Sequence, residues 1–86
     1  MAGPGSYLVG EEEIKELMDL MDSGHLFRYG DLKDPNFKRK VHTLEEEFAA
    51  YSGAPYALAT SSGTSSLLIP LFALGAKPGD EVIVPA

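Results

Sequence analysis

The apolar residues in the first part of the chain recur at helical spacing. They predict a helix over residues 11–23, with its apolar side chains on one face. Three consecutive glutamates beginning at Glu11 fill its first turn, where negative charge complements the helix dipole. Gly24 is the expected end, because glycine readily takes the left-handed conformation that closes many helices. The preceding arm, with Pro4 and three glycines, is expected to be irregular.

A second apolar stripe predicts a helix over residues 43–52. Thr43 and Glu46 fit a capping box, in which the threonine hydroxyl accepts from the helix backbone and the glutamate reaches back to the cap. The loop at residues 31–41 mixes charges with proline and has no sustained period, so it is expected to be irregular. Its basic run at residues 38–40 is interpreted as solvated.

The last third of the chain reads as strand, helix, turn and strand. Short apolar runs predict strands over residues 56–60 and 81–84, and a longer apolar segment predicts a helix over residues 62–75. That helix has no polar face, so we expect it to be covered on most sides. Pro70 inside it removes one backbone hydrogen bond and is expected to kink the axis. The pattern indicates an α/β fold class.

Composition narrows the class of protein. The chain has 86 residues, no cysteine and a formal net charge of -6, which indicates one small unit with a modest core and no disulfides. No apolar run approaches the roughly 20 residues that cross a bilayer, and no signal peptide is visible, so a cytoplasmic location is predicted. The acidic balance disfavours a nucleic-acid surface. The consecutive carboxylates at residues 11–13 point around their helix, so no metal site is predicted.

The turn at residues 61–66, Ser-Ser-Gly-Thr-Ser-Ser, is the candidate site. The first N–H groups of a helix lack intrahelical acceptors and lie at the positive end of its dipole, which favours phosphate. Gly63 has no Cβ to keep a ligand off the backbone, and the neighbouring hydroxyls add donors. The same residues also favour caps and tight turns, so a helix start without a ligand is the alternative.

The order of the motifs along the chain resembles a known family. Residues 57–67 read ALATSSGTSSL, the following helix ends in Ala-Leu-Gly, and residues 77–86 read KPGDEVIVPA. Upstream lie GPGSYLVGEEE, SGHLFRYG and LEEEFAAYSGA. This ordered set resembles the DegT/DnrJ/EryC1/StrS family of pyridoxal-phosphate-dependent sugar aminotransferases, which have fold type I.

The resemblance implies a cofactor, pyridoxal 5'-phosphate, held by its phosphate at Gly63, Thr64 and Ser65 through backbone N–H and hydroxyl groups. The family also uses a lysine that binds the cofactor covalently. The chain has five lysines, Lys15, Lys33, Lys38, Lys40 and Lys77. None of them matches the family's lysine, so no catalytic residue is predicted within this chain.

The resemblance also implies a division of the chain. Residues 1–42 would form an N-terminal arm, helix and loop, and residues 43–86 the incomplete start of the cofactor-binding large domain. The chain would then be the N-terminal portion of a larger protein. In fold type I the strands at residues 56–60 and 81–84 are not neighbours, so both would lack a partner within this chain.

The implied activity is transfer of an amino group from glutamate or glutamine to a keto sugar or related cyclitol, by a homodimer acting on small molecules. One alternative is a sugar dehydratase of the same family. Another is a non-catalytic phosphate-binding or dimerisation module, if the 86 residues act alone. Arg28 and Tyr29 follow the first helix and are interpreted either as lining a substrate pocket, since arginine suits carboxylate or phosphate, or as packing locally.

Overall fold

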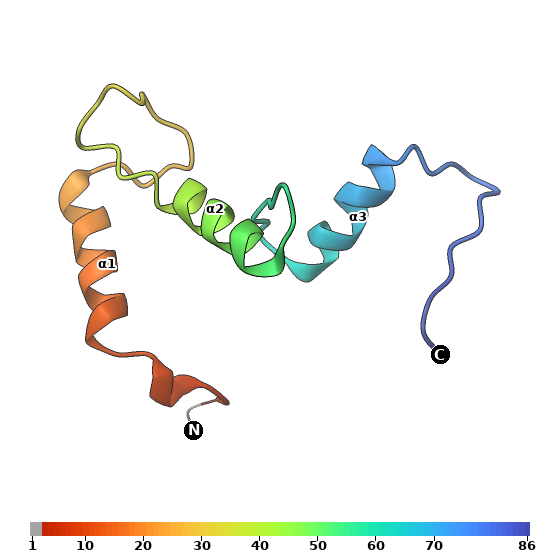
Figure 1. The fold of residues 1–86 in the computed structure, drawn as a ribbon, viewed down its shortest axis with the longest axis horizontal. Coiled ribbons are helices and arrows are strands. Elements are labelled where there is room, and N and C mark those ends of the chain that lie inside the picture. The colour runs from red at the N-terminus through yellow and green to blue at the C-terminus, as the bar shows by residue number, and fades with distance from the viewer. Residues whose placement is uncertain (1–2) are drawn as a thin grey trace.

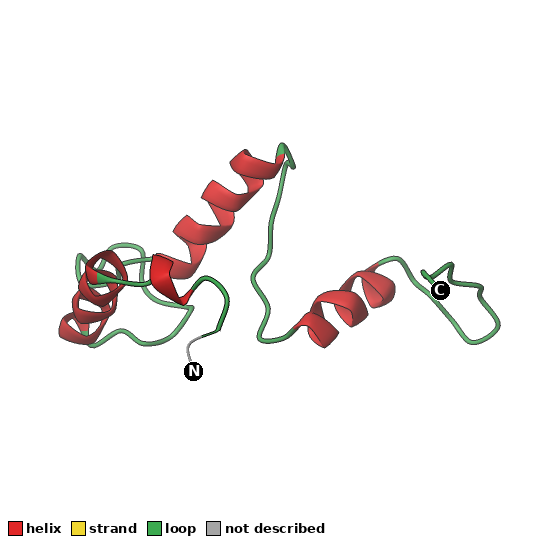
Figure 2. Cartoon of the chain, turned by 90° about the horizontal axis from the view of Figure 1, so that it is seen from below, coloured by secondary structure: helices red, strands yellow, loops and turns green. Residues whose placement is uncertain are grey.

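The computed structural model describes residues 3–86, which form an open chain of helices (Figure 1). A short 3-10 turn, η1 (Ser6–Leu8), precedes the helices α1 (Glu11–Ser23), α2 (Lys40–Ser52) and α3 (Gly63–Ala73). The radius of gyration is 17.3 Å, whereas a compact domain of this length has about 12 Å. Both views show α3 apart from α1 (Figures 1 and 2), so the chain does not close around one core.

Helix α1 has the predicted bounds. Its start is fixed by the Glu13 carboxylate, which accepts a hydrogen bond from the backbone N–H of Gly10 at 2.7 Å. This hydrogen bond lowers the pKa of Glu13. Its end is fixed by Gly24, whose φ of 71° is left-handed and whose N–H bonds the carbonyl of Met21. Both ends therefore depend on nearby residues alone.

Helix α2 begins three residues before the predicted start at Thr43. The Thr43 hydroxyl donates to the carbonyl of Arg39 at 3.0 Å, so it lies within the first turn, and the predicted capping box is wrong. The reason is a contact with α1, because the Lys40 ammonium group lies 2.7 Å from the Asp19 carboxylate and also bonds Glu16. The basic run is thus only partly solvated.

The two predicted strands are not formed within residues 3–86. Residues 56–60 and 81–84 run as irregular backbone with no partner strand, and Ile83 is fully exposed. A strand needs a neighbour to take up its N–H and C=O groups, and these two segments do not pair with each other. The described residues are therefore helical and irregular, and the α/β class is not seen in them.

Helix α3 is shorter than the predicted range of residues 62–75, and Pro70 lies inside it. Most of its apolar side chains are exposed among residues 3–86, so the predicted cover on most sides is not seen there; Leu67 is 72% exposed and Phe72 is 78% exposed. The turn after the helix forms as predicted, because the Lys77 N–H donates to the Asp80 carboxylate at 2.7 Å.

The loop between α1 and α2 folds on itself around Phe37, which is buried. The ring of Phe37 packs on Gly30 so closely that an added Cβ there would lie 2.5 Å from the ring. His25 bonds Asp34 at 3.0 Å beside the same ring. The other buried side chains among residues 3–86 are Glu45 and Ala49, one turn apart on α2.

Candidate functional site

The start of α3 exposes backbone donors where the sequence predicts phosphate binding. Ser62 is the N-cap, and its hydroxyl oxygen accepts from the N–H of Ser65 at 3.1 Å. The N–H groups of Gly63 and Thr64 have no acceptor within residues 3–86. Two of the three predicted N–H donors are therefore free, and that of Ser65 is used by the cap.

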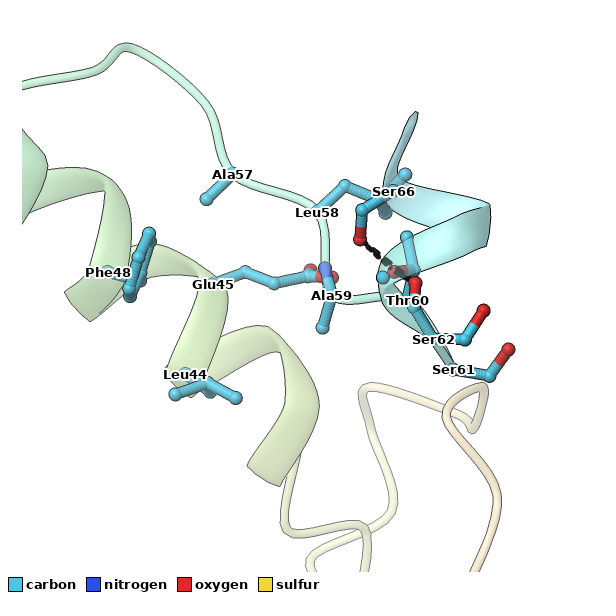
Figure 3. Close-up of a pocket in the computed structure, with 11 residues that line it drawn as sticks. Leu44, Glu45, Phe48, Ala57, Leu58, Ala59, Thr60, Ser61, Ser62 and Ser66 are labelled. Carbon is cyan, nitrogen blue, oxygen red and sulfur yellow. Dashed lines mark hydrogen bonds between the residues drawn. The ribbon is translucent and has the colours of Figure 1, made fainter. Parts of the chain in front are cut away.

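Hydroxyl groups fix the shape of this turn. Thr60 Oγ1 lies 2.5 Å from Ser66 Oγ (Figure 3), and the two hydroxyl oxygens lie 3.0 and 3.1 Å from the carbonyl oxygen of Ser62. Since each hydroxyl has one proton, one donates to the other hydroxyl and the second donates to the carbonyl. The Ser65 hydroxyl accepts from Ser62 at 3.1 Å, which leaves its own proton free to donate. Residues 60–66 thus form one hydrogen-bonded unit.

A cavity of about 520 Å³ lies between α2 and this turn. Such a volume is typical of small-molecule sites. Gly63 lines it, whereas Thr64 and Ser65 do not. Figure 3 shows the side chains of Ser61 and Ser62 turned away from α2. The lining comprises Leu44, Glu45 and Phe48 of α2, residues 57–62, and Gly63 and Ser66 of α3.

Glu45 joins three separate segments at the edge of this cavity. Arg28 donates from Nη1 to Oε1 at 2.6 Å and from Nη2 to Oε2 at 2.9 Å. The backbone N–H of Ala59 donates to Oε1 at 2.8 Å, and Glu45 is only 9% exposed. The paired planar groups match in geometry, which makes such bonds stronger than neutral ones.

The surroundings keep Glu45 ionised. The Arg28 guanidinium, followed by the Ala59 N–H, lowers the pKa of Glu45 from 4.5 to about 2. The same pairing raises the pKa of Arg28. His42 Nδ1 lies 3.8 Å from Oε2, beyond hydrogen-bond distance.

The structure places Arg28 and Tyr29 side by side, and a role for them in a substrate pocket stays a prediction. The guanidinium of Arg28 is paired with Glu45 and lies 5.7 Å from the centre of the Tyr29 ring, which is itself 80% exposed. Arg28 reaches the candidate site only through Glu45. Glu45 was not among the predicted site residues; the one signal in the sequence is that it shares a helix face with the small residue Ala49.

The free groups at the start of α3 fit a phosphate. An added Cβ on Gly63 meets no atom within 4 Å, so a ligand can approach the backbone there. The Thr64 hydroxyl has no partner within residues 3–86 and adds a donor. The described residues hold no group of three or more side chains suited to a metal ion. No helix among them has the length and apolar content to span a membrane.

Residues 8–86 match the model of the DegT/DnrJ/EryC1/StrS aminotransferase family, and the chain belongs to that family. The family implies a fold type I enzyme. The chain is thus a stretch of an aminotransferase-family protein, and the site described above lies within the matched region.

Three relatives show the range of this family. The chain is 45% identical over 76 residues to the spore coat polysaccharide biosynthesis protein SpsC of Bacillus subtilis (strain 168), covering 88% of the chain and 17% of SpsC. It is 38% identical over 76 residues to 3-amino-5-hydroxybenzoate synthase of Amycolatopsis mediterranei (strain S699), covering 88% of the chain and 18% of the relative.

The third relative is the putative L-glutamine:3-amino-2,3-dideoxy-scyllo-inosose aminotransferase of Streptomyces kanamyceticus. It is 41% identical over 75 residues, covering 87% of the chain and 17% of the relative. The chain thus spans less than a fifth of the length of these curated relatives. No solved structure matches the chain.

Proposed function

We propose that the protein containing this chain is a pyridoxal-phosphate-dependent aminotransferase that moves an amino group from glutamate or glutamine to a keto sugar or cyclitol. Family membership supports the reaction class, and the aminotransferase named from Streptomyces kanamyceticus supports a cyclitol-like acceptor. The structural observation that carries the proposal is the pair of free N–H groups at the start of α3, on Gly63 and Thr64. The names of the relatives favour this activity over a sugar dehydratase.

In the proposed reaction, the residues of this chain would bind the cofactor and orient it. The N–H groups of Gly63 and Thr64, with the hydroxyls of Thr64 and Ser65, would hold the cofactor by donating to its phosphate oxygens at the positive end of the α3 dipole. When bound, pyridoxal phosphate supplies an electron sink for the carbon that carries the amino group. Gly63 lines the cavity and leaves the backbone approachable there, and the cavity would give room to the rest of the cofactor.

We further propose that residues 43–86 begin the large domain and that residues 1–42 form the N-terminal arm, helix and loop. In the whole protein the segments at residues 56–60 and 81–84 would join a larger α/β sheet as strands, because each has the apolar pattern of a strand and no partner strand among residues 3–86. A homodimeric assembly and a cytoplasmic location remain predictions.

The test is Gly63→Val in the full-length protein. We expect the dissociation constant for pyridoxal phosphate to rise about tenfold or more, because the branched side chain blocks hydrogen bonds to a charged group. Titration of cofactor-free protein, followed by absorbance, measures it. The matched control is Gly3→Val, since an added Cβ at Gly3 also meets no atom within 4 Å. Equal affinities of the two variants would contradict phosphate binding at this turn.

A further inference from the structure

We propose that Arg28 and Glu45 act as a positioning clamp for the phosphate-binding turn. In this clamp Glu45 holds the backbone N–H of Ala59, and Arg28 holds the Glu45 carboxylate in place. The inference rests on the proposed function, because it assigns these two residues the task of placing Gly63 and Thr64 for the cofactor. Neither side chain is proposed to touch the cofactor.

The first step is that Ala59 is the attachment point of the turn. Within residues 3–86, the bond from Ala59 to Glu45 is the only hydrogen bond that joins residues 55–86 to the preceding part of the chain. Ala59 directly precedes the hydrogen-bonded unit of residues 60–66. A change in the position of Ala59 therefore moves the whole start of α3 as one body.

The second step is that Glu45 needs Arg28. A carboxylate that is 9% exposed and loses its cationic partner retains a costly unpaired charge. The side chain would then rotate toward water and release Ala59, because one neutral N–H does not replace a two-point charged contact. Arg28 is in turn carried by the loop that packs around Phe37, next to Gly30.

The third step is that the clamp lies beside the cavity. Glu45 and Ala59 both line it (Figure 3), and Gly63 lines it as well. The wall that Glu45 fixes is thus the same wall that ends in the free N–H groups. Loss of the clamp changes the orientation of those groups without removing any of them.

The test compares Arg28→Met, Arg28→Lys and Glu45→Gln with the wild type in the full-length protein. Two quantities are measured: amide hydrogen exchange at residues 59–66 without cofactor, and the dissociation constant for pyridoxal phosphate. We expect Arg28→Met to raise both about tenfold, the scale of a charge-assisted hydrogen bond. Arg28→Lys should raise both quantities by less than Arg28→Met does, because lysine still pairs with one carboxylate oxygen.

Arg39→Met is the matched control. Arg39 directly precedes α2, and its Nη2 lies 3.6 Å from Oε1 of Glu46 and does not pair with Glu45. Exchange and the dissociation constant should therefore stay at the wild-type values in this variant. In the double variant Arg28→Met with Glu45→Gln, exchange and the dissociation constant should rise no further than in the more damaging single variant. The reason is that each single substitution already breaks the same Arg28–Glu45 interaction. Exchange and affinity unchanged in Arg28→Met would overturn the clamp.

Failure of the proposed function has a separate signature. If the wild type binds no pyridoxal phosphate, the proposed function fails. Exchange without cofactor then still decides whether the clamp holds the turn: faster exchange at residues 59–66 in Arg28→Met supports it, and unchanged exchange overturns it.

Discussion

At the scale of single residues, Glu45 differs from its neighbours Glu46 and Glu47 only in the helix face that it occupies. Glu45 shares a face with buried Ala49 and meets Arg28 and the backbone of Ala59. Glu46 has a side chain that is 70% exposed and lies 3.6 Å from Arg39. Identical carboxylates thus have different tasks, because the helix turns one of them toward two other segments.

The lowered pKa of Glu45 predicts an acid-dependent loss of stability. A group whose pKa is lower in the folded state contributes stability above its ordinary value of 4.5, and this is lost as pH falls toward about 2. We expect the stability difference between wild type and Glu45→Gln to be constant above about pH 5 and to shrink below it. Urea unfolding over a pH series measures this difference. A difference that stayed constant down to pH 2 would contradict the lowered pKa.

The candidate site was partly predictable from single residues. Gly63 and Thr64 carry free N–H groups where the Ser-Gly-Thr turn indicated a helix start, since end groups of a helix lack partners by geometry. The N–H of Ser65 is used by Ser62, which depends on a side-chain rotamer. The pairing of Arg28 with Glu45 depends on how a loop folds, and no local pattern specifies that.

At the scale of elements, local signals located the helices and long-range contacts moved their ends. Helix α1 has the predicted bounds because nearby Glu13 and Gly24 stop it on both sides. Helix α2 starts early because Lys40 bonds residues of α1, which the sequence pattern does not reveal. The strand pattern at residues 56–60 is present without a strand, because pairing requires a second segment.

The contact between α1 and α2 is expected to depend on salt. Lys40 pairs with Glu16 and Asp19, and these interactions raise the pKa of Lys40, with Asp19 contributing most. Because the partners are partly exposed, we expect Lys40→Met to lower stability slightly at low salt and hardly at all at about 1 M salt. Thermal unfolding at both concentrations tests this, with Lys15→Met as the control. A loss that is equal at both concentrations would contradict an ionic origin.

At the scale of the whole molecule, the chain leaves most of its apolar side chains uncovered. Its extents are 49 × 40 × 23 Å, and apolar residues of every helix are exposed. A soluble domain of this size normally buries about 60% of its unfolded surface. The curated relatives are several times longer, and in them the matched stretch accounts for 17–18% of the length.

Helix α3 should be unstable when residues 1–86 are studied alone. It has 11 residues, and isolated helices shorter than about 12–15 residues are marginal in water. We expect its amides to exchange almost as fast as in an unfolded peptide, and much more slowly in the full-length protein. Hydrogen exchange of both forms, with α1 as the internal reference, measures this. Strong protection of α3 in the 86-residue chain would contradict it.

The bond between Arg28 and Glu45 has a consequence for chimeric proteins. It joins residue 28 to residue 45 and so crosses the boundary that we propose between residues 42 and 43, where the arm would meet the start of the large domain. A chimera joined at that boundary would take the arginine from one parent and the glutamate from the other. Grafts between family members should therefore move residues 24–59 together, so that both charges and the backbone group they hold come from the same parent.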